Sequence, residues 1–166
     1  MNKIESFLVN HLNLKSGLYV SRKDSCNNVT VTTFDLRFTM PNKEPVMTSP
    51  AIHTLEHLGA TYLRNSSEKE KIVYFGPMGC KTGFYLILFG DLSSYDVYPL
   101  VVKMLEFIVN FEGEIPGATP IECGNYSEQD LPTAKAYAKE YLHRLTTLKN
   151  LKYEEWFIMN HSFKLK

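Results

Sequence analysis

The stretch VTVTTFDLRFT, residues 29–39, constrains the fold of this chain more than any other segment. Apolar and polar side chains alternate along it, and many of its residues are β-branched or aromatic, which predicts a β-strand with one buried face. Two apolar runs further on, KIVYF (71–75) and FYLILF (84–89), predict two more strands that lie beside each other. We therefore expect a sheet that other elements cover on one side.

Three segments predict helices that form this cover. Pro50 follows the potential caps Thr48 and Ser49, so a helix is expected from there to about Arg64, because proline in the first turn loses no intrahelical hydrogen bond. Apolar residues at helical spacing predict two further helices. They are Val101, Met104, Leu105 and Ile108 in one, and Ala134, Ala138, Tyr141, Leu142 and Leu145 in the other. Since the order lacks a regular βαβ rhythm, we expect an α+β fold with an antiparallel or mixed sheet packed against helices.

The length and the charge of the chain narrow its class. A chain of 166 residues can form one domain around a single core, which we place at residues 1–166. The 18 Lys and Arg residues balance the 18 Asp and Glu residues, so nothing favours nucleic acid or an anionic membrane as a partner. No run approaches the roughly 20 apolar residues of a membrane span, and the first residues lack the apolar core of a signal peptide. We expect a cytoplasmic protein whose partner is a small ligand or another protein.

Two histidines four residues apart carry the clearest chemical signal. In IHTLEHL, His53 and His57 lie one turn apart on the predicted helix, so both imidazoles can reach a single ion, with Glu56 beside them. This H-x-x-E-H pattern occurs in inverzincins, in which the glutamate is a general base. The pattern also recurs by chance, and such histidines can be ordinary surface or core residues. Taken alone, it leaves a metal site and a structural role equally open.

A catalytic metal site usually takes three protein ligands and keeps one position open, so a third donor is needed. Cys123 in IECGNY is the best candidate, because it ends a predicted short strand and a glycine follows it. A buried cysteine is also a common inert core residue. His11, His143 and His161 compete for the role, although the last two fit a solvated surface better.

The three cysteines are odd in number and widely spaced, so we expect free thiols rather than a disulfide framework. Cys80 lies in GPMGCKTG, a glycine-flanked turn between two predicted strands, where its thiol can be partly exposed. Next to Lys81 and near a bound cation, a thiol ionises more easily and can act as an acid or a base near neutral pH. The turn would equally hold a cysteine of no consequence, and Cys26 in the polar loop KDSCNN is interpreted as incidental.

Four motifs together resemble one family. FDLRFTMPNKEP, IHTLEHL, GPMGCKTGFY and IECGNY, in this order and at these separations, are similar to S-ribosylhomocysteine lyases, the LuxS family that makes the precursor of autoinducer-2. SFLVNHL near the start and the helix after GNY fit as well, so the resemblance covers nearly the whole chain. One departure lies before PMGC, where some members carry an acidic residue and this chain has Tyr74 and Phe75. A substrate contact made by such an acid cannot be carried over.

The resemblance implies an α+β homodimer with two active sites at the subunit interface. Each site holds one divalent ion, with Fe(II) as the native ion and zinc or cobalt able to replace it. Carried over to this chain, the ligands are His53, His57 and Cys123, and water or a substrate oxygen takes the open position.

The resemblance also implies roles for five other residues. Glu56 and Cys80 become the acid/base pair. Ser6, His11 and Arg37, from the N-terminal and FDLRF motifs, become contacts to the substrate. Two of these have ordinary alternatives, since His11 can be a core residue and Arg37 can be a salt-bridge partner on a strand face.

The implied reaction cleaves the thioether of S-ribosyl-L-homocysteine into L-homocysteine and 4,5-dihydroxy-2,3-pentanedione. Two isomerisations move the ribose carbonyl along the carbon chain and acidify the carbon beside the one that bears sulfur, after which homocysteine leaves by β-elimination. A divalent ion can stabilise the enediolate of each isomerisation. The product serves quorum sensing or the recycling of homocysteine and methionine, and the sequence does not decide between them.

Two other function classes remain open at this stage. A small metallohydrolase would also use two helical histidines, a cysteine and a glutamate base around an activated water, but it would not need Cys80. A structural metal or protein-interaction module would close the coordination sphere with a fourth protein ligand. No fourth cysteine or histidine stands at convincing spacing.

Overall fold

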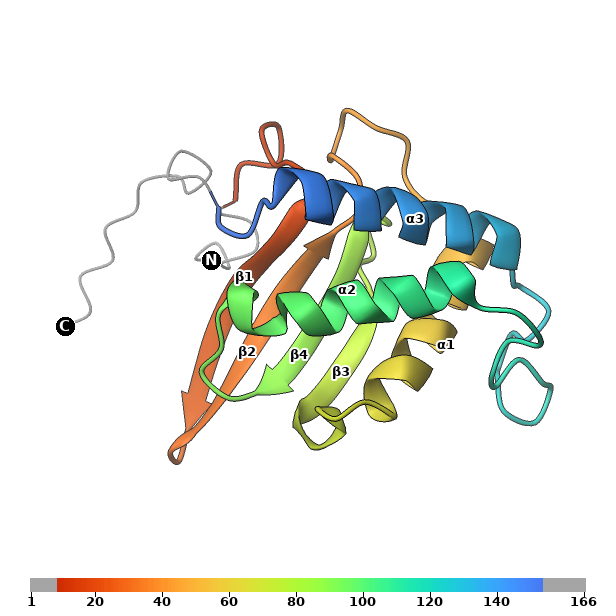
Figure 1. Ribbon diagram of the computed structural model, residues 1–166, viewed down its shortest axis with the longest axis horizontal. Helices are drawn as coiled ribbons and strands as arrows, with labels where there is room; N and C mark the ends of the chain where they lie inside the picture. The colour runs from red at the N-terminus through yellow and green to blue at the C-terminus, as the bar shows by residue number, and fades with distance from the viewer. Residues whose placement is uncertain (1–8, 154–166) are drawn as a thin grey trace, which may run out of the picture.

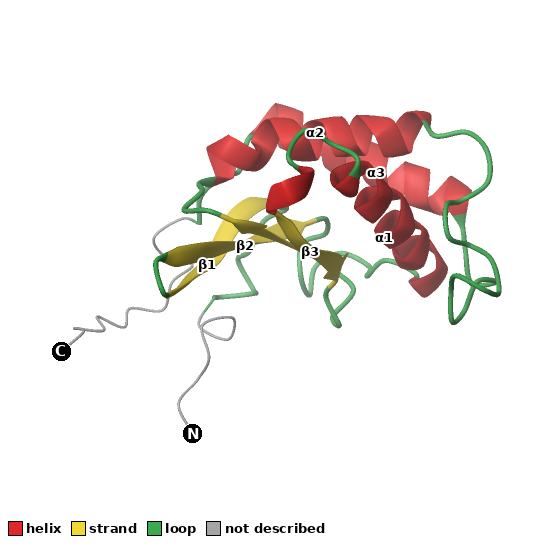
Figure 2. Cartoon of the chain, turned by 90° about the horizontal axis from the view of Figure 1, so that it is seen from below, coloured by secondary structure: helices red, strands yellow, loops and turns green. Residues whose placement is uncertain are grey.

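The computed structural model describes residues 9–153, which form a four-stranded sheet with three α-helices against one of its faces (Figure 1, Figure 2). The strands are β1 (Gly17–Cys26), β2 (Val29–Arg37), β3 (Ile72–Pro77) and β4 (Gly83–Phe89). The helices are α1 (Ser49–Arg64), α2 (Ser94–Asn110) and α3 (Leu131–Leu148), with a short 3-10 helix, η2, at Lys69–Lys71. The strand order is β1-β2-β4-β3, and every neighbouring pair is antiparallel. The α+β prediction is confirmed, with an antiparallel rather than a mixed sheet.

The core lies between the sheet and the helices. On β2 and β4 alternate side chains, among them Phe34, Leu36 and Phe84, are fully buried on the helix side. The predicted apolar residues of α2 and α3 are buried too, except Leu142, which is partly buried. Burial of each large apolar side chain contributes about 1.5–3 kcal/mol. This burial sets the strand register, because a slip of one residue would turn the whole apolar set of β2 away from the core.

Local signals place the helix ends. Ser93 and Asp96 form a capping box at the start of α2, and the Asp130 carboxylate accepts a hydrogen bond from Thr133 N (3.0 Å) at the start of α3. Thr48 occupies the N-cap position of α1 without a side-chain cap, so Pro50 is the stronger start signal there. No helix within residues 9–153 has the length and apolar character needed to cross a membrane.

The edge strand β1 has no counterpart among the predicted strands. Its second half, from Arg22 onward, is polar and exposed, so it lacks the alternation of a half-buried strand. It pairs along the whole of β2, and Asn27 and Asn28 both adopt positive φ angles (48° and 65°), as a two-residue hairpin turn requires. Cys26 therefore ends a strand and does not lie in a polar loop.

The predicted strand at residues 121–123 is wrong. The N–H groups of Glu122 and Cys123 both donate to the carbonyl of Thr119 (3.1 and 3.0 Å), which closes a turn. Ile121 is 96% exposed, so no apolar contact holds this segment against the sheet. Cys123 instead lies in the α2–α3 loop, the connection between α2 and α3, which contacts α1 through the histidines described below.

Candidate active site

Two histidines of α1 and one cysteine of the α2–α3 loop converge. The Nε2 atoms of His53 and His57 are 3.1 Å apart, and the Cys123 sulfur is 3.3 Å from His53 Nε2. The three donor atoms all lie within 4.8 Å of one another, and each side chain is half-buried. The structure thus brings together the three residues that the sequence predicted as metal ligands. We call them the metal cluster.

Backbone carbonyls fix the proton on both rings. His53 Nδ1 donates to the carbonyl oxygen of Glu128 (2.9 Å), and His57 Nδ1 donates to that of Pro116 (2.7 Å). A carbonyl oxygen only accepts, so Nδ1 carries the proton in each ring and Nε2 presents a bare lone pair. Facing lone pairs repel, and a cation between them and the sulfur would remove the repulsion. Two imidazoles and a cysteine sulfur are a donor set suited to zinc and iron ions, so the residues present fit the metal.

The α2–α3 loop is shaped to meet these rings. Gly117 has a φ of +71°, and a Cβ there would lie 3.3 Å from His57 Nδ1, so a glycine lets the neighbouring Pro116 carbonyl reach the ring. The N–H of Asn125 points at the Cys123 sulfur (3.4 Å). Glu56 is half-buried on α1, directly before His57 in the sequence. The loop therefore determines ring orientation, which the helix alone would leave open.

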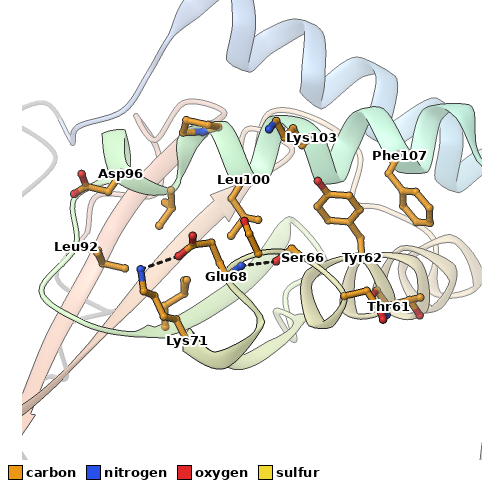
Figure 3. A pocket seen from close by; sticks show the side chains of 15 residues that line it. Thr61, Tyr62, Ser66, Glu68, Lys71, Leu92, Asp96, Leu100, Lys103 and Phe107 are labelled. Carbon is orange, nitrogen blue, oxygen red and sulfur yellow. Dashed lines mark hydrogen bonds and ion pairs between the residues drawn. The ribbon is translucent and has the colours of Figure 1, made fainter.

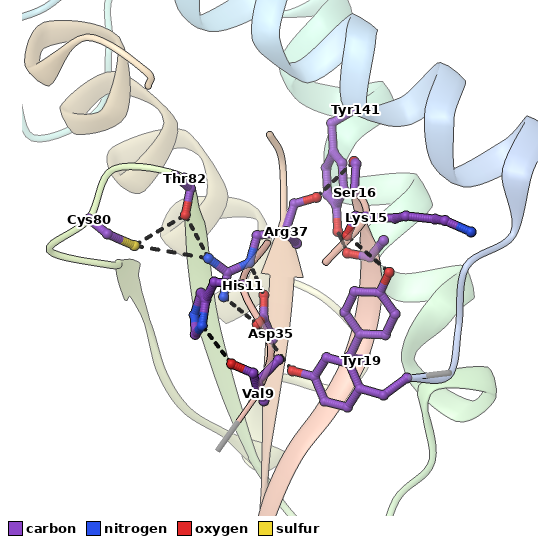
Figure 4. Close-up of polar contacts among 12 residues, drawn as sticks. Val9, His11, Lys15, Ser16, Tyr19, Asp35, Arg37, Cys80, Thr82 and Tyr141 are labelled. Atoms are coloured by element: carbon purple, nitrogen blue, oxygen red, sulfur yellow. Dashed lines mark hydrogen bonds and ion pairs between the residues drawn. The ribbon is translucent and has the colours of Figure 1, made fainter. Parts of the chain in front are cut away.

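A second polar cluster forms where β2 ends beside the β3–β4 turn (Figure 4). The Arg37 guanidinium donates to both carboxylate oxygens of Asp35, from Nε (3.1 Å) and from Nη2 (2.5 Å). Its Nη1 donates to Thr82 Oγ1 (2.6 Å) and lies 3.9 Å from Cys80 Sγ. Arg37 and Asp35 are each 3% exposed. We call these four residues the arginine cluster.

Three members of the arginine cluster, Asp35, Arg37 and Cys80, line a cavity of ≈ 440 Å³, within the size range of small-molecule sites. Burial alone would lower the pKa of the Arg37 guanidinium, but the facing Asp35 carboxylate outweighs it, and the pKa is raised above its ordinary value. Burial, and then the same carboxylate, raise the pKa of Tyr153 and of Tyr85, so both stay neutral phenols. Tyr153 donates its hydroxyl proton to Asp35 (3.2 Å). His11 also lines the cavity, and its Nδ1 donates to the carbonyl of Val9 (2.8 Å).

The remaining residues that the sequence analysis considered for the site are Cys80, His143, Ser6 and His161. The Cys80 side chain is exposed, as expected, but Lys81 donates to Ser49 Oγ (2.8 Å) and Arg37 is the cation at the thiol. His143 is exposed on α3, in agreement with its surface interpretation. Ser6 and His161 lie outside the described residues.

The sequence analysis did not single out Asp35 and Thr82. Asp35 stands two residues before Arg37 on one strand, and side chains at this spacing share a face, so the pairing was readable from the sequence. Thr82 stands two residues after Cys80 in a turn, where no periodicity applies. Its place beside Arg37 follows from the β2–β4 register, which pairs Arg37 with Gly83.

Tyr74 and Phe75, which stand where some family members carry an acidic residue, lie on β3. Phe75 is a core residue that stacks on Phe84, with ring centroids 5.0 Å apart. Tyr74 is 46% exposed and pairs with Ile87 of β4. Neither lines the cavity of the arginine cluster.

The metal cluster and the arginine cluster share no side chain, and no hydrogen bond found within residues 9–153 joins them. Glu56 accompanies the first and Cys80 belongs to the second. A larger cavity of ≈ 730 Å³ lies between α1 and α2 (Figure 3), but no predicted site residue lines it. Glu68 and Lys71 of its lining form an ion pair (2.8 Å). We therefore place the chemistry in the two clusters.

A set of two histidines and one cysteine supplies three protein donors, the number that catalytic metal sites usually take. Together with a cavity that presents a thiol and a guanidinium, it defines a metal-dependent enzyme with a small substrate. Residues 4–152 match the family model of S-ribosylhomocysteinase (LuxS). The chain belongs to this family.

Curated relatives cover almost the whole chain. S-ribosylhomocysteine lyase of Finegoldia magna is 57% identical over 157 residues, which are 93% of this chain and 100% of the relative. The lyase of Clostridium acetobutylicum is 57% identical, over 85% of this chain and 90% of the relative. That of Borreliella burgdorferi is 54% identical, over 92% of this chain and 99% of the relative.

Proposed function

We propose that this chain is an S-ribosylhomocysteine lyase, a carbon–sulfur lyase that converts S-ribosyl-L-homocysteine to L-homocysteine and 4,5-dihydroxy-2,3-pentanedione. The observation that carries the proposal is the three-donor metal cluster, formed by the residues at which the family motifs predict ligands. We place the enzyme in the cytoplasm, and its balanced charge supports the absence of a nucleic-acid or membrane partner. The product links the activity to quorum sensing and to homocysteine and methionine metabolism.

His53, His57 and Cys123 would hold one divalent ion per subunit, Fe(II) in the native enzyme, with zinc or cobalt able to substitute. The donor set supports all three metals. When bound, the ion polarises a carbonyl oxygen of the substrate and stabilises negative charge that develops there. The carbonyls of Pro116 and Glu128 hold the rings in the orientation that this binding needs.

Glu56 and Cys80 move the protons. Each isomerisation takes a proton from one carbon and returns one to its neighbour, which needs two side chains that both accept and donate. Arg37, with its charge fixed by Asp35, would bind hydroxyl groups or the carboxylate of the substrate, and His11, which lines the same cavity, would also contact the substrate. Ser6 would add a further contact.

We further propose a homodimer whose active sites lie at the subunit interface. Within one chain the metal cluster and the arginine cluster share no residue, and a second copy would bring Glu56 of one chain and Cys80 of the other to one substrate. The sheet face opposite the helices supports this, because Val29, Tyr74 and Phe89 are 50%, 46% and 47% exposed there. An open apolar face on a sheet is typical of a homodimer interface.

The decisive assay follows the release of homocysteine. The protein is loaded anaerobically with Fe(II) or Co(II) and incubated with S-ribosylhomocysteine, and free thiol is measured. We expect release from the wild type, and loss of about 10²–10⁴-fold in Cys80→Ala and Glu56→Gln proteins that retain metal. Matched controls are Cys26→Ala and Glu70→Gln, which change exposed residues outside both clusters and should leave release unchanged.

The metallohydrolase alternative makes the opposite prediction for Cys80. Hydrolysis by a metal-activated water does not use that thiol, so Cys80→Ala would be spared. No homocysteine release from a folded, metal-loaded protein would contradict the lyase.

A further inference from the structure

The hydroxyl of Thr82 lies between two groups of the arginine cluster. It is 2.6 Å from Arg37 Nη1 and 3.1 Å from Cys80 Sγ, and Thr82 is 4% exposed. The Thr82 carbonyl accepts hydrogen bonds from the N–H groups of Phe38 and Thr39 (3.0 and 3.1 Å). The backbone is therefore anchored to the end of β2, and the hydroxyl has a fixed position (Figure 4).

The direction of these hydrogen bonds follows from what each group can donate. A guanidinium has N–H donors and no acceptor, so Thr82 Oγ1 must accept from Arg37. A hydroxyl has one proton of its own, which then has to point elsewhere. Among residues 9–153, the remaining hydrogen-bond contact of this hydroxyl is with the sulfur of Cys80. The hydroxyl can therefore accept from Arg37 and donate its own proton to that sulfur.

Asp35 holds the guanidinium that donates to this hydroxyl. Its two oxygens accept from Nε and Nη2 of Arg37, which holds the guanidinium plane and turns Nη1 towards Thr82. Tyr153 donates to the same carboxylate (3.2 Å). The guanidinium itself lies 3.9 Å from the sulfur, beyond a strong hydrogen bond. Thr82 thus provides the shorter polar contact to Cys80.

We propose that Thr82 is a positioning residue that donates its hydroxyl proton to the Cys80 thiolate and holds the sulfur for proton transfer, with Arg37 setting the direction of donation. A hydrogen bond from a hydroxyl to a thiolate stabilises the charged form of the sulfur. The inference rests on the proposed function only in giving Cys80 an acid/base role. The donation itself can be measured without substrate.

The other charged or titratable side chains near the thiol are accounted for. His11, Asp35, Arg37, Tyr85 and Tyr153 line the same cavity as Cys80, and Lys81 of the turn donates to Ser49. All of these side chains are still present in the Thr82 variants. A change in thiol ionisation on replacing Thr82 would therefore report the missing hydroxyl.

The test measures alkylation of Cys80 against pH. Metal-loaded protein with Cys26→Ser is treated with iodoacetamide between about pH 5 and 10, because only the thiolate reacts. The modified Cys80 peptide is quantified by mass spectrometry, which separates it from Cys123. Thr82→Val removes the hydroxyl at nearly constant volume, and Thr82→Ser retains it.

We expect the midpoint of the Thr82→Val profile to rise by about one pH unit, equivalent to about a tenfold loss of alkylation on the acidic limb. Thr82→Ser should keep the midpoint of the wild type. In the lyase assay, kcat of Thr82→Val should fall more than KM changes, since the substrate-binding walls remain. If Thr82→Val does not fold, as judged by thermal unfolding, Thr82→Ala removes the same hydroxyl with less crowding.

Equal midpoints in all variants would overturn the proposal. A shift in Thr82→Ser as large as in Thr82→Val would also overturn it, because the hydroxyl is present in one and absent in the other. If the wild type releases no homocysteine while the Val midpoint still rises, the lyase proposal fails and the inference on Thr82 stands.

Discussion

The metal cluster and the arginine cluster differ in how their charges are arranged. His53, His57 and Cys123 bring together three donor atoms, and backbone carbonyls hold the two histidine rings. The arginine cluster is neutralised internally, because Asp35 pairs with Arg37 in a buried position. A cluster of metal-binding donor atoms contributes little to folding in the metal-free protein. A buried ion pair, in contrast, belongs to the folded core, so damage to the two clusters should affect different properties.

The largest effect should come from removing a metal ligand. We expect His57→Ala to lower the metal content from about one ion per chain to nearly none, because a three-donor site loses one of its ligands. Activity should fall at least about 10³-fold, since the ion supplies several kcal/mol of charge stabilisation. Metal content is measured by elemental analysis, and release by the thiol assay.

His57→Ala also tests whether the metal cluster, unlike the arginine cluster, contributes little to stability. The melting temperature of metal-free His57→Ala should stay close to that of the metal-free wild type, because relief of the repulsion between the facing lone pairs offsets the lost hydrogen bond to the Pro116 carbonyl. His143→Ala, at an exposed histidine of α3, is the control and should retain metal and activity. A large loss of stability in metal-free His57→Ala would mean that the metal cluster is also part of the core.

Mixed dimers test whether the two clusters belong to one site. If each site takes the metal cluster of one subunit and Cys80 of the other, a dimer of one Cys80→Ala chain and one His57→Ala chain has one intact site and one doubly defective site. Random mixing makes half of the dimers mixed, so about a quarter of the wild-type activity should return from two inactive proteins.

A matched mixture serves as the control. His53→Ala mixed with His57→Ala places one defect in every metal cluster, so no activity should return. No recovery in the first mixture would mean that Glu56 and Cys80 act within one chain, and that the distance between the clusters closes by a movement of that chain.

Local periodicity explains most of what the sequence predicted. The two histidines share a helix face because residues four apart always do, and β2, β3, β4 and the helices carry their own period-2 or period-3.6 patterns. The strand β1 carries no such pattern in its polar half, and its partner β2 and the Asn27–Asn28 turn decide its conformation. Its pairing is a tertiary effect.

The unpredicted parts of the site depend on contacts between distant segments. Cys123 reaches His53 from a turn and not from the strand that the sequence indicated. Thr82 meets Arg37 because Gly83 pairs with Arg37, and a Cβ at Gly83 would lie 2.3 Å from the Leu36 carbonyl. No spacing along the chain encodes these approaches, whereas the family motifs pointed to Cys123 and Cys80.

The second-largest effect should be a loss of stability when the buried ion pair of the arginine cluster is broken. We expect Asp35→Asn to lower the free energy of unfolding by about 3–5 kcal/mol, because it leaves the buried Arg37 charge without its partner. Urea unfolding of the metal-free protein measures the change. Asp24→Asn is the matched control on β1, where Asp24 pairs with Arg22 (2.9 Å) and both side chains are 56% exposed. It should cost about 0–1 kcal/mol.

The metal content of Asp35→Asn tests whether the two clusters are independent. Asp35→Asn protein that remains folded should bind about one ion per chain, because the metal cluster shares no residue with the arginine cluster. A fall in metal content at unchanged fold would contradict the separation.

The smallest effect concerns Glu44, on the segment that connects Arg37 to α1. Its carboxylate accepts two hydrogen bonds from Arg144 (2.8 and 3.0 Å) and one from Met40 N (2.7 Å). Partial burial alone would raise the pKa of Glu44, but these hydrogen bonds outweigh it and lower the pKa below its ordinary 4.5. A carboxylate whose pKa is lowered on folding stabilises the fold above its unfolded pKa, and this contribution is lost as the pH falls through the folded pKa.

We therefore expect Glu44→Gln to be less stable than the wild type by about 1 kcal/mol at about pH 7, a magnitude typical of partly exposed pairs. The difference should shrink at an acidic pH below the lowered pKa of Glu44, where the wild-type carboxyl becomes protonated. Urea unfolding at both pH values measures it, and Glu140→Gln, at the more exposed partner of Arg144, is the control with the smaller cost. Metal content and thiol alkylation should not change, because Glu44 belongs to neither cluster. If either does change, the segment between Arg37 and α1 transmits strain, and the two clusters respond as one unit.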